Sequence, residues 1–214
     1  MKIPLRELEQ VRKDPRTYLR KREGASRGAF NSKSTYATLQ RAALHYHKSS
    51  GDLDSARKYL EAAYAKQFKD QRSLKGNLEK LDRYAAAFTM LGNRVFRMNN
   101  LLTVSLPEGL SREITLTARI PRLDLTSKGY AVWLFAKEPT ELRTELRLPL
   151  ILDTYSKRLS SPLDEITVGV YDFATASYES YNFSQREINR AMAELEQLVD
   201  RLASMARPKT LREF

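Results

Sequence analysis

Hydrophobic and polar positions follow a helical period in the first 92 residues. Apolar side chains recur three and four positions apart in STYATLQRAALHYHK, SGDLDSARKYLEAAYAKQFKD and SLKGNLEKLDRYAAAFTMLGN. Gly92 is a residue of the kind that ends a helix. An earlier helix in LRELEQVRK should end or restart at Pro15, which cannot donate a backbone hydrogen bond. The first part of the chain is therefore expected to be a set of helices.

After Gly92 the pattern changes to alternation of apolar and polar residues, as in half-buried strands. Strands are predicted in LLTVSLPE, EITLTARIP and KGYAVWLFAK, and later in DEITVGVYDF and YESYNF. Between these two groups, PTELRTELRLPLILDTYSKRL predicts a helix that is bent or offset at Pro149. The predicted order is four helices, three strands, a helix, two strands and a helix.

The closing helix has the strongest local signals. Ser184 and Glu187 have the spacing of a capping box, and Phe183 and Ile188 can pack across the first turn. Its apolar stripe consists of Ile188, Met192, Leu195, Val199 and Leu202.

The element order predicts an α/β fold with a sheet sandwiched by helices. We expect a basic, all-α N-terminal lobe over residues 1–73, an α/β core over 74–205 and a flexible tail over 206–214. A length of 214 residues fits one core with an appended helical lobe.

Composition excludes several classes of protein. The chain has no apolar run of the roughly 18 to 20 residues that cross a bilayer, and its start, MKIPLRELEQVRK, is charged throughout. These features predict a cytoplasmic protein without membrane contact. The absence of cysteine excludes disulfides and thiolate sites. His45 and His47 lie two positions apart, which on a helix is poor geometry for sharing a metal. No nucleotide, dinucleotide, serine-hydrolase or zincin motif is present, so no cofactor is expected.

The formal charge of +11 is concentrated in the first part of the chain. Residues 1–80 hold 19 Lys and Arg against 9 Asp and Glu, whereas residues 81–214 hold 18 against 17. A surplus of this kind is what a surface that contacts phosphates needs. Its alternatives are an acidic protein partner or helices kept soluble by charge. The candidate nucleic-acid-binding residues in this region are Arg16, Arg20, Lys21, Arg22 and Arg27.

Three segments, ARIPRLDL, YAVWLFAK and LRLPLILDTYSKRL, have a further significance in this order and spacing. They resemble the RecB-like branch of the PD-(D/E)XK nuclease superfamily, in which a strand ends like GxIDRxD, the next ends like DYK, and a helix opens like LQLPLYALAL. The resemblance covers roughly residues 74–205. It implies a restriction-endonuclease-like mixed sheet flanked by helices.

The resemblance also implies where a catalytic site would lie. The first metal-binding acid falls on Pro121, the second on Phe135, the lysine on Lys137 and the helix glutamine on Arg147. Strand alternation puts Pro121 on the same side as Arg119, and Phe135 on the same side as Lys137. Because magnesium requires hard oxygen ligands, proline and phenylalanine cannot replace the two acids. The chain is therefore expected to lack nuclease activity.

Three residues of this former site could instead hold phosphate without hydrolysing it. Arg119, Lys137 and Arg147 would form a basic patch in the former active cleft. In the alternative interpretation, Lys137 is a solvated charge at a strand end and Arg147 pairs with Glu141 or Glu145. Trp133 could stack a base, but on this strand it is more often a residue that packs under a helix.

Three functional hypotheses follow. The first is a catalytically inactive nuclease-like protein that binds nucleic acid, with DNA as the expected kind, as a subunit of a recombination, repair or phage-defence complex. The second is an adaptor that docks a helicase or nuclease partner. The third is a metal-dependent nuclease with relocated acids, for which the candidates are Asp124, Glu138, Glu141 and Glu145.

Overall fold

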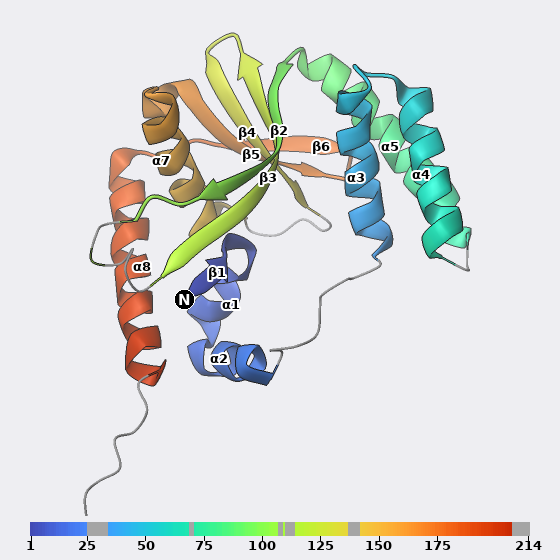
Figure 1. Ribbon diagram of the computed structural model, residues 1–214. Coiled ribbons are helices and arrows are strands. Elements are labelled where there is room, and N and C mark those ends of the chain that lie inside the picture. The colour runs from blue at the N-terminus through green and yellow to red at the C-terminus, as the bar shows by residue number, and fades with distance from the viewer. Residues whose placement is uncertain (25–33, 69–70, 107–108, 110–113, 137–141, 207–214) are drawn as a thin grey trace, which may run out of the picture.

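The protein is described by a computed structural model that covers residues 1–24, 34–68, 71–106, 109, 114–136 and 142–206. Its strands form one mixed sheet (Figure 1). They are β1 (Lys2–Pro4), β2 (Arg94–Thr103), β3 (Thr115–Thr126), β4 (Gly129–Ala136), β5 (Ile166–Asp172) and β6 (Ser177–Tyr181). The order is β1-β3-β4-β5-β6, and β2 also pairs with β3.

The sheet combines an antiparallel meander with a parallel crossover. β2, β3 and β4 follow one another as antiparallel neighbours, and β4 then pairs in parallel with β5. The crossover contains the helix α7 (Arg147–Leu159), and β6 adds an antiparallel edge. The prediction of a mixed α/β sheet flanked by helices is thus confirmed, and so is the predicted order of the main elements from β2 onward. Before β2 the prediction of four helices is wrong, because the described residues there form the strand β1 and five α-helices.

The remaining helices are short 3-10 turns and longer α-helices. The 3-10 turns are η1 (Leu5–Glu7), η2 (Leu142–Thr144) and η3 (Leu163–Glu165). The α-helices are α1 (Leu8–Lys13), α2 (Pro15–Gly24), α3 (Thr35–Lys48), α4 (Leu53–Gln67), α5 (Arg72–Leu91) and α8 (Gln185–Ala206). α7 and α8 lie on one side of the sheet and α3, α4 and α5 on the other (Figure 1).

Two hydrophobic cores follow from this arrangement. The larger core joins the sheet to α7 and α8, and the smaller core joins α3, α4 and α5 to the end of β5 and to Phe173. Ile3, Leu5, Leu8 and Val11 belong to the larger core, and β1 pairs with β3. The sequence predicts one helical lobe over residues 1–73, whereas the structure packs the beginning of this range with the sheet.

Two element boundaries differ from their predictions. The first strand of the meander begins at Arg94, not near residue 101, because the side chains of this edge strand are mostly exposed and carry little apolar signal. The helix of the crossover begins at Arg147, after the turn η2. Pro149 therefore lies in the first turn of α7, where its missing N–H is not needed, rather than at a bend within a longer helix.

The local signals at helix ends are confirmed. Glu187 accepts hydrogen bonds from the backbone N–H and the hydroxyl of Ser184, both at 2.7 Å, and the Glu187 N–H donates back to Ser184 Oγ at 3.3 Å. Gly92 ends α5 with a φ of 68°, a left-handed conformation that suits glycine.

Candidate functional site

A buried charge pair lies between the sheet and the helices α3 to α5. Arg122 on β3 has a fully buried side chain, and its Nε lies 2.9 Å from Oδ1 of Asp124, which is also fully buried. The angle of this contact falls short of a hydrogen bond, and Nη2 of Arg122 has no hydrogen-bond partner among the described residues. Burying both charges is costly, so the surrounding groups must offset the cost.

Hydroxyl groups and aromatic rings surround the Arg122 guanidinium. Its Nη1 donates to the hydroxyl of Tyr84 at 2.6 Å and to that of Tyr178 at 3.0 Å. The guanidinium carbon also lies 4.6 Å from the ring centroid of Phe88 and 5.8 Å from that of Trp133. Tyr84 and Phe88 are on α5, whereas Trp133 and Tyr178 are on the sheet. Arg122 therefore connects the helical layer to the sheet through cation–π contacts and hydrogen bonds.

This environment shifts the pKa values of three neighbouring groups. Burial and the positive charge of Arg122 lower the pKa of His47 to about 3, so this histidine is neutral. His47 Nε2 lies 2.6 Å from the Tyr84 hydroxyl. Burial raises the pKa of Tyr84 well above its ordinary value, and burial also raises the pKa of Asp124 although Arg122 opposes that shift.

The burial of Arg122 is not among the sequence predictions. The signal for it lies in the segment ARIPRLDL, whose Arg122 and Asp124 match the arginine and the last aspartate of GxIDRxD. From the sequence, Asp124 is expected only as a candidate for a relocated metal-binding acid. The structure instead places it in an ion pair inside the protein.

Pro121 and Phe135, the positions to which the resemblance assigns acids, lie on adjacent strands. Arg122 is paired with Trp133 in the β3–β4 ladder, so Pro121 and Phe135 are one step apart in register. The Phe135 ring packs against Tyr84, at 5.7 Å between ring centroids, in the smaller core. Pro121 is half-buried. Neither side chain offers the carboxylate oxygen that a divalent cation needs, so these residues do not fit a magnesium site.

Strand alternation does not run unbroken through Pro121. Ile120 and Leu123 are an odd number of residues apart, yet both belong to the larger core. Across the ladder, Asn99 has a φ of 50°, a left-handed conformation that asparagine tolerates. Proline cannot donate a backbone hydrogen bond to the ladder. We therefore attribute the shift in which residues face the larger core, between Ile120 and Leu123, to Pro121 and the neighbouring Asn99. The predicted alternation is confirmed before Pro121 for the buried residues Ile114, Leu116 and Ile120 and for the exposed Thr115 and Arg119.

Arg147 and Lys137 are the other two residues that the resemblance assigns to a site. Arg147 forms an ion pair with Glu145, and burial raises the pKa of that glutamate. The alternative prediction, that Arg147 pairs with an acid near the start of its helix, is thus confirmed. Lys137, Glu138 and Glu141 lie outside the described residues.

Trp133 packs inside the protein rather than presenting its ring to a ligand. Its side chain is buried and lies 4.6 Å from the Tyr178 ring. Gly169 makes room for it, because a Cβ at Gly169 would lie 2.2 Å from an atom of the indole ring. The expectation that Trp133 packs under a helix is confirmed by its contact with Arg122, which α5 covers.

Exposed arginines gather along the edge strand β2 and its neighbour β3. We define the β2 rim as Arg94, Arg97 and Arg119, all of which are exposed. Arg119 Nη1 donates to Oδ1 of Asn99 on β2 at 2.9 Å. Arg147 instead pairs with Glu145, which precedes α7. β2 contains no acidic residue, and the one acid of β3 is the buried Asp124. No carboxylate of these two strands therefore offsets the charge of the rim.

A second group of cations lies on α2. Arg16, Arg20, Lys21 and Arg22 are exposed, and Arg22 donates to the Tyr18 hydroxyl at 2.8 Å. α2 lies beside α1, away from α3 to α5 (Figure 1). Arg27 lies outside the described residues.

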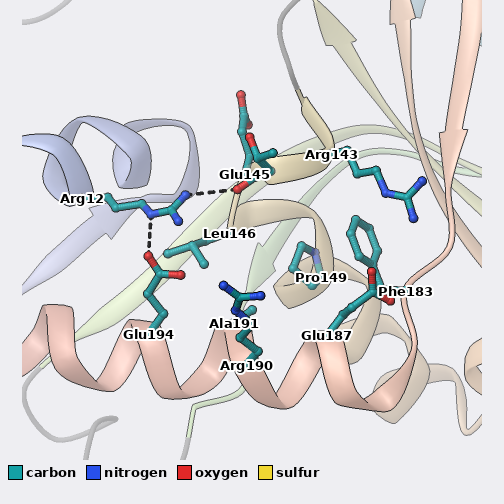
Figure 2. A pocket seen from close by; sticks show the side chains of 11 residues that line it. Arg12, Arg143, Glu145, Leu146, Pro149, Phe183, Glu187, Arg190, Ala191 and Glu194 are labelled. Carbon is teal, nitrogen blue, oxygen red and sulfur yellow. Dashed lines mark hydrogen bonds and ion pairs between the residues drawn. The ribbon is translucent and has the colours of Figure 1, made fainter.

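A cleft of about 280 Å³ lies between α8 and the start of α7 (Figure 2). The three acids that line it already have partners: Glu194 accepts from Arg12 Nε at 2.6 Å, Glu187 caps α8, and Glu145 pairs with Arg147. Arg12 also donates to the Thr144 carbonyl at 3.1 Å. Arg143 and Arg190 border the cleft as well. The degenerate positions Pro121, Phe135 and Arg147 do not line it.

The described residues contain neither a cluster of metal-ligating side chains nor a helix that could span a membrane. No three His, Asp or Glu side chains within the described ranges come together as a metal site would require. Likewise, none of the helices in the described part of the chain combines the length and apolar character needed to cross a bilayer.

Comparisons with known proteins do not assign the chain to a family. No family model matches the sequence, and no curated protein matches it. Among solved structures, one described as "Crystal structure of SSO0001" is similar with a TM-score of 0.36 and 9% sequence identity, over 95% of this chain and 97% of that chain. A TM-score of 0.36 is too low to carry an inference about fold or function.

Proposed function

We propose that this protein is a catalytically inactive, nuclease-like protein that binds nucleic acid. The observation that carries the proposal is the β2 rim, where Arg94, Arg97 and Arg119 are exposed and the one acid of the two strands is buried against Arg122. Guanidinium groups bind phosphate oxygens through charge-assisted hydrogen bonds. The cations of α2 would supply further phosphate contacts.

The order of elements supports the nuclease-like part of the proposal. A helix, a three-strand antiparallel meander, a crossover helix and a parallel strand follow one another in the chain. The resemblance of the three sequence segments implies this order. It also implies that the acids of a metal site would stand at Pro121 and Phe135.

The chemistry of the same positions supports the absence of catalysis. A metal would orient and activate the attacking water only if carboxylates held it. Phe135 is packed among aromatic rings, and Asp124 is held by Arg122. Glu145 is paired with Arg147. A subunit without its own chemistry would act with an enzyme, so the proposal includes a helicase or nuclease partner in a recombination, repair or phage-defence complex.

Charge neutralisation tests the binding function. Binding of a labelled oligonucleotide should weaken steeply with salt, because each neutralised phosphate adds about 0.7 to 0.9 to the slope of log affinity against log salt concentration. The triple variant Arg94→Gln, Arg97→Gln, Arg119→Gln should bind more weakly and lower this slope by about 2. A charge-matched control on α8 carries Arg186→Gln, Arg190→Gln and Arg201→Gln. Equal losses in both triple variants, or no binding of the parent protein at low salt, would contradict the proposal.

A cleavage assay tests the inactive state. Purified protein incubated with single- and double-stranded DNA and Mg²⁺ or Mn²⁺ should leave both substrates intact. Cleavage that the Glu145→Gln or Glu141→Gln variant abolishes would instead establish the nuclease with relocated acids.

A further inference from the structure

We infer that the β2 rim takes single-stranded nucleic acid, with bases stacked on Phe96. The inference rests on the proposed function and specifies its substrate class. It starts from the position of exposed apolar side chains, which phosphate binding alone does not explain.

Exposed apolar side chains concentrate where the arginines lie. Of the five exposed large hydrophobic side chains among the described residues, three are Met90, Phe96 and Leu101, at 88%, 41% and 55%; the other two are Met1 and Met205. All three fall within twelve consecutive residues, at the end of α5 and along β2. Leu101 stands directly opposite Arg119 in the β2–β3 ladder. Positive charge and apolar surface therefore occur together on both faces of this edge, Leu101 with Arg119 on one face and Phe96 with Arg97 on the face of the larger core.

The ladder explains why Phe96 is exposed. Val95 pairs with Asp124 and Arg97 pairs with Leu123, so the register skips Phe96. An extra residue of this kind forms a β-bulge, which redirects side chains at the edge of a sheet. The Arg97 guanidinium lies 5.1 Å from the Phe96 ring centroid, and the Tyr130 ring centroid lies 5.8 Å away. Phe96 thus contacts a cation and a second ring while 41% of it stays exposed.

This combination favours a single strand over a duplex. In a duplex the bases are stacked on one another, so a protein meets mainly phosphates and groove edges. A single strand offers both phosphates and the free faces of its bases, and aromatic side chains stack on these faces without regard to sequence. Arginine beside an aromatic ring strengthens such a platform. An acidic peptide would supply negative charge but, unless it carried aromatic residues, no flat ring for Phe96.

The probes are a fluorescently labelled oligothymidylate and a hairpin duplex with the same number of phosphates. Fluorescence anisotropy should show tighter binding of the oligothymidylate by the parent protein. Phe96→Ala should weaken this binding roughly 5- to 100-fold with little change in the salt slope, and should leave duplex binding nearly unchanged. Phe96→Trp should restore the affinity. Met205→Ala, which removes a side chain that is 37% exposed on α8, is the matched control and should have no effect.

The outcomes separate the inference from the proposed function. Binding of both probes with equal affinity, or an equal response of both to Phe96→Ala, would overturn the inference and leave nucleic-acid binding intact. Displacement of oligothymidylate by polyglutamate at equal charge concentration would also overturn it, in favour of an acidic protein ligand. Failure of the parent protein to bind either probe at low salt would remove the proposed function itself. Thermal unfolding followed by circular dichroism checks that Phe96→Ala and Phe96→Trp are folded.

Discussion

Arg122 is the largest fully buried side chain among the described residues, and it carries a charge. Its ion pair with Asp124 does not by itself stabilise the protein, because both groups lose their hydration. Tyr84 and Tyr178 replace part of that hydration by accepting hydrogen bonds. Removing one member of such a set leaves the others buried without partners.

We predict that Arg122→Met destabilises the protein by about 3 to 5 kcal/mol, because it leaves the Asp124 carboxylate buried and unpaired. Urea denaturation at neutral pH measures the change in the free energy of unfolding. The double variant Arg122→Met, Asp124→Leu should recover much of the loss. If the double variant is no more stable than the single one, the ion pair is not the source of the effect.

His47 should make the stability depend on pH in the acid range. Its pKa of about 3 in the folded protein lies below the ordinary value of 6.5, so the unfolded chain binds the proton first. The contribution of His47 is therefore complete above about pH 6.5 and is lost progressively as the pH falls toward 3. Between pH 7 and pH 5 the loss should be about 2 kcal/mol.

The comparison of the parent protein with His47→Gln measures this contribution. The glutamine amide can still bond to the Tyr84 hydroxyl but does not titrate, and all other groups are common to both proteins. The difference in the free energy of unfolding should therefore fall by about 2 kcal/mol on going from pH 7 to pH 5. A difference that does not change with pH would show that the pKa of His47 is the same in the folded and unfolded states.

From the sequence, the resemblance predicts which residues stand where a nuclease would have acids, namely Pro121 and Phe135, and this stays a prediction. The sequence does not predict the contacts around Arg122. The burial of Arg122 depends on Tyr84, Phe88 and Tyr178, which lie 38, 34 and 56 residues away along the chain. A local sequence pattern does not predict contacts between residues so far apart along the chain.

At the scale of the element, α8 was the most predictable part of the fold. Its cap and its apolar stripe are both local patterns, and the structure buries Ile188, Leu195, Val199 and Leu202 as expected. Elements without periodicity were not predictable. β1 spans only Lys2–Pro4 and is a strand because β3 lies beside it. β2 is an edge strand whose exposed arginines hide its alternation.

The cap of α8 gives a prediction at this scale. Ser184→Ala should destabilise the protein by about 1 kcal/mol, because it removes the hydroxyl oxygen that accepts a hydrogen bond from the Glu187 N–H. Thermal or urea unfolding measures the loss. Ser204→Ala is the control: Ser204 is exposed near the other end of the same helix and bonds to a carbonyl of its own last turns. A loss as large at Ser204 would mean that the cap has no special role.

At the scale of the whole molecule, the two cores meet at one layer of side chains. Val168 and Val170 of β5 belong to the larger core. Tyr171, also in β5, and Phe173, which follows the strand, belong to the smaller core. On the side of the smaller core, Arg122 of β3 donates to Tyr84 of α5 and to Tyr178 of β6, so it joins the helices to the sheet. Strands shared in this way make it costly for one core to open while the other stays closed.

We therefore predict that α3 to α5 and the sheet unfold together. Trp133, the only tryptophan of the chain, lies against Arg122 and reports on this boundary by fluorescence. Circular dichroism at the same urea concentrations reports on all helices. The two transitions should coincide in midpoint and slope. A fluorescence change that precedes the loss of helix would show instead that the helical layer detaches first.

The pairing of β1 with β3 has a consequence for synthesis of the chain on the ribosome. Lys2 aligns with Thr115, so the first strand is made 113 residues before its partner. At about 5 to 20 residues per second, that interval lasts roughly 6 to 23 seconds. During this time Ile3, Leu5 and Leu8 have no β3 to pack against. These apolar side chains are thus open to a chaperone until the meander leaves the exit tunnel.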